Sequence, residues 1–244
     1  MIINNKYKFI FIHVPKTAGT SISHALSHLE GNVPAVCEYH EDFAGFHKHR
    51  RIKDFKLDEK EFKLNGLPLG MPANMSHLLD FPFEDYFKFS FVRNHWSRVF
   101  SGYCWLHEFG KDHAPNAKPF QPYKSHFEEF IKGTCCEKEN IPYSSKYFYY
   151  KYYMSQPISY TQTSFFEIDN SNVMDFIGRH ENLPEDLKKI YDLIGIEEGN
   201  RLKLIHKNRS RSNSENYKDY YSEYTRKLVA DKFHEDIEKF DYTF

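Results

Sequence analysis

The feature that most constrains this chain is an apolar run near the N-terminus that leads through a turn into a helical pattern. Residues Lys8–Val14 (KFIFIHV) are nearly all apolar, as a strand of a parallel sheet buried on both faces requires. The turn PKTAGTS follows, and then apolar residues recur at helical spacing: Ile22, Ala25, Leu26 and Leu29. Thr20 or Ser21 is expected to cap this helix, and Gly31 to end it. This segment therefore predicts a strand, a Gly-containing loop and a helix.

Two further strand–helix pairs are expected along the chain. Tyr86–Val92 (YFKFSFV) is a second strand candidate, and the helix after it is marked by Val99, Phe100, Tyr103 and Leu106. Asn172–Ile177 is a third strand candidate. The next helix is opened by Pro184, carries two acids in its first turn, Glu185 and Asp186, and ends at Gly195.

A last helix is expected from about Ser222, with one apolar face: Leu228, Val229, Phe233, Ile237 and Phe240. No internal repeat or low-complexity linker is visible, so residues 1–244 are predicted to form a single domain. Strands that alternate with helices favour an α/β fold whose central parallel sheet is flanked by helices and joined by right-handed crossovers.

Composition excludes several classes of protein. The chain has 33 Lys and Arg against 34 Asp and Glu, a net charge of −1, which argues against a general nucleic-acid binder. No apolar run approaches the roughly 18 residues of a membrane span, and the N-terminus is too interrupted by charge for a secretory signal. The four cysteines form no CxxC pair. A cytoplasmic protein with reduced thiols and no stable membrane insertion is the simplest interpretation.

The turn PKTAGTS has the properties of an anion-binding loop. Backbone N–H groups at a helix N-terminus point outward, and the helix dipole adds partial positive charge. Gly19 would allow close approach of an anion, Lys16 supplies one charge, and three hydroxyls come from Thr17, Thr20 and Ser21. The Walker pattern GxxxxGK[ST] is not met, because the Lys precedes the Gly. At the end of the second strand, Arg93 stands where a magnesium-binding acid would be expected.

These motifs resemble those of PAPS-dependent sulfotransferases. HVPKTAGTS is similar to the family's 5′-phosphosulfate loop, and FSFVRNHWSRVFSGY to its 3′-phosphate motif, whose Arg and Ser correspond to Arg93 and Ser101. DFIGRHENLPEDL and the C-terminal YYSEYTRKLVADKFHEDIEKFDY resemble the carbohydrate-sulfotransferase branch, sulfotransferase family 2. His95 stands where relatives carry Pro. The resemblance implies a P-loop-like three-layer fold.

The resemblance also implies a reaction and its residues. A sulfuryl group would pass from PAPS to an acceptor hydroxyl, on a carbohydrate, leaving PAP as product; no metal is required. Lys16 would stabilise the leaving phosphate, and His77 is predicted to be the general base, because a His near its ordinary pKa suits that role. His13 is expected to shape the turn, and His40 and Glu41 are weaker base candidates. The predicted cofactor-binding residues are Pro15, Lys16, Thr17, Ala18, Gly19, Thr20, Ser21, Arg93, Ser101, Arg209, Ser210 and Arg211.

Several other segments have two interpretations. Arg179 and Glu181 either line the pocket or belong to a loop tied by local hydrogen bonds. The segment HKNRSRSN (206–213), which contains the predicted Arg209, Ser210 and Arg211, either folds over the cofactor or is a solvated basic loop. The basic cluster at 47–51 is expected to be a solvated face, and the aromatics at 143–153 to be core or groove wall.

Two other functions remain open from the sequence. One is a P-loop-like small-molecule kinase, which the misplaced Lys and the missing magnesium acid disfavour. The other is a protein that binds PAP or PAPS without catalysis, which the presence of both Lys16 and His77 disfavours.

Overall fold

The structure is a computed structural model, and it describes residues 1–33, 78–113, 124–135, 156–169, 171–202 and 216–244. The chain divides into two compact units. The first unit comprises Met1–Val92 with Gln162–Ile205, and the second comprises Arg93–Thr161 with His206–Phe244. The single domain expected from the sequence stays a prediction.

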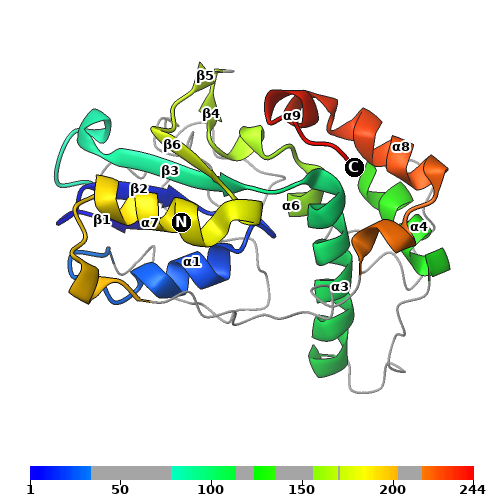
Figure 1. The fold of residues 1–244 in the computed structure, drawn as a ribbon, viewed down its shortest axis with the longest axis horizontal. Coiled ribbons are helices and arrows are strands. Elements are labelled where there is room, and N and C mark those ends of the chain that lie inside the picture. The colour runs from blue at the N-terminus through cyan, green and yellow to red at the C-terminus, as the bar shows by residue number, and fades with distance from the viewer. Residues whose placement is uncertain (34–77, 114–123, 136–155, 170, 203–215) are drawn as a thin grey trace, which may run out of the picture. The chain divides into compact units, whose positions relative to one another are not determined.

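The first unit is built on a four-stranded sheet (Figure 1). Its strands are β1 (Ile2–Asn4), β2 (Phe9–Ile12), β3 (Phe87–Val92) and β6 (Phe176–Arg179), in the order β1-β2-β3-β6. β2 pairs with β3, and β3 with β6, in parallel, as the sequence predicted. β1 is antiparallel to β2 at the edge of the sheet, because only a short turn joins the two strands.

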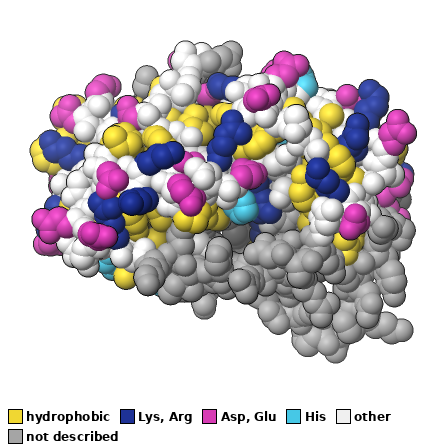
Figure 2. Space-filling model, viewed as in Figure 1, with side chains coloured by type: hydrophobic (Ala, Val, Ile, Leu, Met, Phe, Trp, Pro, Cys, Tyr) yellow, Lys and Arg dark blue, Asp and Glu magenta, His cyan; other side chains and the backbone are white. Residues whose placement is uncertain are grey.

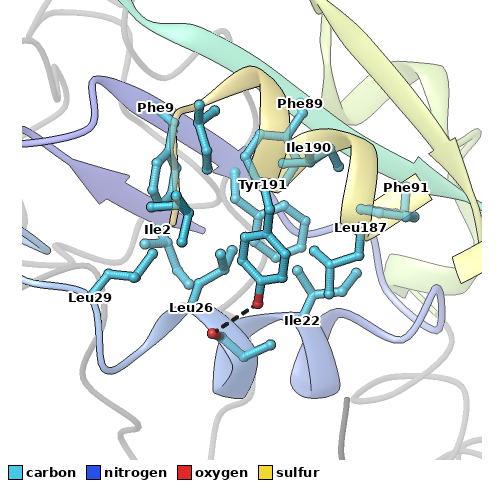
Figure 3. Packing of buried hydrophobic residues seen from close by; sticks show 14 of the residues in the cluster. Ile2, Phe9, Ile22, Leu26, Leu29, Phe89, Phe91, Leu187, Ile190 and Tyr191 are labelled. Carbon is cyan, nitrogen blue, oxygen red and sulfur yellow. Dashed lines mark hydrogen bonds between the residues drawn. The ribbon is translucent and has the colours of Figure 1, made fainter. Parts of the chain in front are cut away.

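Two helices cover one face of this sheet. α1 (Gly19–Leu26) and α7 (Leu183–Leu193) pack against alternate residues of the strands. Figure 3 shows this core, in which Phe9, Phe89 and Phe91 meet apolar residues of both helices. The hydroxyl of Tyr191 donates to the carbonyl of Ala25 at 3.2 Å, so the polar end of this buried side chain ties α7 to α1. The fold is therefore mixed α/β, with a mostly parallel sheet flanked by helices.

Some element boundaries of the first unit differ from those expected. The helix after the loop begins at Gly19, so neither Thr20 nor Ser21 caps it: Ala18 is the N-cap, and no side chain bonds there. The helix also ends at Leu26, well before Gly31, whose φ of 91° belongs to the return turn. The Gly31 carbonyl accepts from the N–H of Asn5, so this turn contacts the residues that follow β1.

The third strand candidate, Asn172–Ile177, is only partly correct. Its first residue belongs to β5 (Ser171–Asn172), which forms a small hairpin with β4 (Glu167–Ile168). The sheet strand β6 starts at Phe176, because only from there do residues pair with β3. α7 begins with Pro184 in its first turn, and Gly195, with a φ of 73°, follows its end, both as predicted.

The second unit is helical in its described part. It contains α3 (His95–His113), α4 (Lys124–Cys135), α6 (Gln156–Ser159), α8 (Glu223–Lys232) and α9 (His234–Lys239). Its core is aromatic and brings α3 and α4 together with the segment before α8; the rings in mutual contact belong to Phe100, Tyr103, Phe127, Tyr220 and Tyr221. Among the described helices, none has the length and apolar character needed to cross a bilayer.

The expected C-terminal helix is two helices. α8 starts directly after Ser222, close to the predicted position. The structure adds a capping box there: Ser222 and Thr225 exchange side-chain-to-backbone hydrogen bonds. The helix then breaks at Phe233, whose φ of −116° and ψ of 25° are not helical. Phe233 is fully buried and stacks on His95, with ring centroids 4.2 Å apart. The break therefore lies at a point of tertiary contact that helical periodicity does not reveal.

Candidate functional site

The loop after β2 has an unusual backbone. Lys16 and Ala18 both have left-handed φ values, 68° and 67°, which non-glycine residues rarely adopt. Each such residue costs on the order of 1 kcal/mol, so the rest of the loop must hold the conformation. The buried hydroxyl of Thr17 does part of this, because it donates to the carbonyl of Val14 at 2.9 Å.

The loop ends in a helix N-terminus that lacks a side-chain cap. The carbonyl of Ala18 accepts the first helical hydrogen bond, from the N–H of Ile22 at 3.1 Å. The N–H groups of Gly19, Thr20 and Ser21 therefore precede the hydrogen-bond ladder of α1. This arrangement suits an anion, since such N–H groups and the helix dipole both favour negative charge.

His13 packs closely against the start of α1. A Cβ placed on Gly19 would lie only 1.8 Å from His13 Cδ2 and 2.0 Å from Nε2. The His13 ring also stacks over Phe11, with centroids 6.1 Å apart. From the sequence, a glycine at position 19 was explained by the close approach of an anion. The structure adds a second explanation, because the His13 imidazole leaves no room for a side chain there. The expectation that His13 shapes the turn agrees with this packing.

Further polar groups of the first unit lie near the carboxyl ends of its parallel strands. The buried Ser90 hydroxyl of β3 donates to the carbonyl of Ile12 at 2.9 Å, and so links the two strands just before the loop. β6 ends at Arg179, which is paired with Val92 in the register of the sheet. Ligands of parallel α/β sheets bind beyond the carboxyl ends of the strands, where these residues lie.

The loop after β6 is tied by local hydrogen bonds, one of the two interpretations open for it. The backbone N–H of Arg179 donates to Asp186 Oδ2 at 2.8 Å, and Asn182 Nδ2 and Lys189 Nζ each contact Oδ1 at 3.0 Å. Burial alone would raise the pKa of Asp186, but these hydrogen bonds outweigh it and hold the pKa below its ordinary value. The side chains of Arg179 and Glu181 are exposed.

In the second unit, Arg93 is held at the start of α3. It is 9% exposed, and its Nε donates to Ser97 Oγ at 2.9 Å. Asn94 caps the helix: its Oδ1 accepts from the N–H groups of Trp96 and Ser97 at 3.1 and 3.3 Å. Ser101, the other predicted phosphate-binding residue of this segment, lies on the same helix and is 6% exposed.

The C-terminal segment fixes the first turn of α3. Asn94 Nδ2 donates to the carbonyl of Thr243 at 2.7 Å, and Trp96 Nε1 to the carbonyl of Arg226 at 3.0 Å. The Tyr221 hydroxyl donates to the Trp96 carbonyl at 2.9 Å. The conformation of the residues beside Arg93 therefore depends on residues more than a hundred positions later in the chain.

His95 and Arg98 add two buried titratable side chains to this turn. His95 Nε2 lies 2.7 Å from Asp236 Oδ2, and both side chains are fully buried. Burial lowers the pKa of His95 to about 4, so its ring is neutral at pH 7 and donates to the carboxylate. Arg98 donates to the carbonyl of Tyr160 at 3.0 Å; burial lowers its pKa to about 10, so it stays charged.

The described residues cover part of the predicted site. The loop residues Pro15 to Ser21 lie in the first unit, and Arg93 and Ser101 in the second. The remaining predictions lie outside the described residues: His77, Arg209, Ser210, Arg211, His40, Glu41, the basic cluster at 47–51 and the aromatics at 143–153. Sequence reasoning did not single out Asn94, Ser97 or Arg98. Ser97 had a usable signal, since a polar residue in the first turn of the helix after Arg93 is close to it in the chain.

Charged side chains of both signs share the surface. On the face drawn in Figure 2, Lys and Arg side chains are interspersed with Asp and Glu. Within the described residues, no group of three or more His, Cys, Asp or Glu side chains is arranged to hold a metal ion. Of the four cysteines, Cys104 and Cys135 are described, and neither forms a disulfide.

Comparison with known proteins gives one match over the whole chain. The family model described as "Sulfotransferase family" matches residues 1–243. A protein of Archaeoglobus fulgidus named "Uncharacterized protein" is 29% identical over 118 residues, which are 48% of this chain and 73% of that protein. No solved structure matches the chain.

Proposed function

Because this chain belongs to the sulfotransferase family, we propose that it transfers the sulfuryl group of PAPS to an acceptor hydroxyl on a carbohydrate. The observation that carries the proposal is the loop after β2, where Lys16 precedes a helix N-terminus without a side-chain cap. Such a site suits a phosphosulfate group, which is a compact anion. We further propose a P-loop-like three-layer fold for the chain and a cytoplasmic location.

The proposed donor has two anionic ends, and the chain offers a group of residues for each. The 5′-phosphosulfate would be bound by Lys16, the Thr20 and Ser21 hydroxyls and the first N–H groups of α1. The 3′-phosphate would be bound by Arg93 and Ser101, with Arg209, Ser210 and Arg211 as additional ligands. The low exposure of Arg93, 9%, supports this role, because a shielded guanidinium binds phosphate more strongly than one in bulk water.

The reaction breaks the bond between sulfur and the bridging oxygen of the 5′-phosphate and forms a bond between sulfur and the acceptor oxygen. PAPS supplies the sulfuryl group and a phosphate leaving group. Lys16 and the α1 N–H groups stabilise the negative charge that develops on the bridging oxygen. We assign the acceptor's proton to His77, the predicted general base. The products are the sulfate ester and PAP.

Binding of PAP and the role of Lys16 test this proposal together. PAP should raise the melting temperature, by the equivalent of about 2.7 kcal/mol at one hundred times its Kd. Lys16→Ala should lower turnover about a hundredfold or more, because a donor to the developing charge is lost, while the affinity for PAP falls much less.

The matched control is Lys6→Ala. Lys6 is an exposed lysine of the first unit that pairs with Glu30, and an exposed pair contributes little to stability. This variant should bind PAP and turn over like the wild type. Absence of a melting shift at millimolar PAP would rule out the proposed donor.

A further inference from the structure

The structure points to a residue that works through Arg93. Ser97 stands one helical turn after Arg93, and its Oγ accepts a hydrogen bond from Arg93 Nε at 2.9 Å. Arg93 precedes the capping residue Asn94, and Ser97 lies in the first turn of α3, so this contact spans the start of the helix. The contact is partly buried: Arg93 is 9% exposed, and Ser97 is of intermediate burial.

This contact limits the orientation of the guanidinium. A guanidinium has five N–H donors in a rigid plane, so fixing Nε fixes the direction of the two terminal nitrogens. An arginine held in this way loses less rotamer freedom when a phosphate binds than a freely moving one does. Because the Ser97 hydroxyl accepts the bond from Nε, its own O–H can still donate a second hydrogen bond.

Ser97 is itself held in place. Its N–H donates to Asn94 Oδ1 at 3.3 Å, and Asn94 Nδ2 donates to the carbonyl of Thr243 at 2.7 Å. The acceptor for Arg93 is therefore part of a capped helix start that is anchored to the C-terminal segment. A merely local surface contact would lack this support.

We propose that Ser97 is a positioning residue that presents Arg93 to the 3′-phosphate and thereby selects nucleotides that carry this phosphate. This inference rests on the proposed function. It assigns to Ser97 a part in specificity that neither the family motif nor the sequence pattern gave it.

The test compares two nucleotides that differ only in the 3′-phosphate, PAP and adenosine 5′-phosphate, by titration calorimetry. Ser97→Ala should weaken PAP binding roughly tenfold and leave adenosine 5′-phosphate unchanged, since one hydrogen bond to a charged group is lost. Ser97→Thr keeps the hydroxyl and should restore the affinity. In an Arg93→Met background, Ser97→Ala should have no further effect, because the side chain on which it acts is gone.

Ser27→Ala is the matched control. It removes an exposed serine hydroxyl that donates to the His24 carbonyl, and it should change neither affinity. If the wild type prefers PAP and Ser97→Ala keeps that preference in full, the role of Ser97 is refuted while the proposed function stands. If the wild type itself shows no preference for PAP, the proposed function fails, and the inference fails with it. Equal weakening of both nucleotides would indicate a structural role only and would also contradict the inference.

Discussion

Gly19 and His13 meet so closely that the loop cannot accept a side chain at position 19 without moving. The Cβ of an alanine would lie 1.8 Å from the His13 ring, far inside van der Waals contact. Gly199, in the same unit, would have no atom within 4 Å of an added Cβ, so it offers the steric room that position 19 lacks. The contact makes the imidazole a structural part of the loop.

Gly19→Ala should therefore weaken PAP binding by about tenfold or more, because the ring must move and the first N–H groups of α1 move with it. The loss should shrink in a His13→Ala background, where the collision is absent. Calorimetric titration of PAP measures both. Gly199→Ala should bind like the wild type, and a Gly19→Ala protein that does the same would contradict the packing described.

For single residues, the sequence predicts those whose role is local. Lys16, Thr17 and Gly19 stand in one short loop, and their chemistry is evident from the motif. Asn94 is different: one of its partners, Thr243, is 149 positions away. Hydrogen bonds over such separations leave no local pattern, so the anchoring of the residues beside Arg93 emerges only from the structure.

Among the elements, the junction of α3 with α9 carries a titratable pair. The His95 ring stacks on Phe233, at the break between α8 and α9, and bonds to Asp236 of α9. The motif that this segment resembles has Pro where His95 stands. In this chain the position therefore links two helices through a hydrogen bond that proline could not make.

The stability of the protein should depend on the pH through His95. Burial lowers its pKa from 6.5 to about 4 in the folded state, so the unfolded chain binds more protons between these values. The free energy of unfolding that depends on a neutral His95 is fully present above pH 6.5 and is lost as the pH falls toward 4. The loss amounts to about 3 kcal/mol. Urea unfolding at several pH values measures it.

His95→Gln provides the comparison for that measurement. Glutamine can donate to Asp236 but does not titrate. The free energy of unfolding of the variant should therefore fall less steeply than that of the wild type between pH 6.5 and 4. Groups that do not contact position 95 titrate equally in both proteins, so the difference reports the His95–Asp236 pair. Equal pH slopes in the two proteins would show that the buried imidazole is not the cause.

Elements with a strong, uninterrupted pattern were predicted well. The expected strand Tyr86–Val92 is β3 within one residue, and the expected start of the last helix near Ser222 is confirmed by α8. Asn172–Ile177 was misassigned because a short run does not distinguish a hairpin strand from a sheet strand. The break at Phe233 was missed because its apolar neighbours keep a helical period on both sides of it.

For the whole molecule, the α/β class and the mostly parallel sheet followed from the alternation of strands and helices, and the whole-chain family match agrees with the motifs. The antiparallel β1 did not follow, since strand direction depends on how neighbouring strands are connected. The motifs favour a carbohydrate acceptor but do not identify which one, because the loop and Arg93 motifs bear on the donor. The reaction is therefore best tested through transfer itself.

The most direct test of the central claim is transfer of a labelled sulfuryl group from PAPS to a panel of carbohydrates and simple alcohols. The wild type should place label on a hydroxyl acceptor without added metal, with one PAP formed for each sulfate ester. Lys16→Ala should lower the rate of this transfer about a hundredfold or more. A protein that binds PAP but labels no acceptor, or that instead moves the terminal phosphate of ATP in the presence of magnesium, would contradict the account.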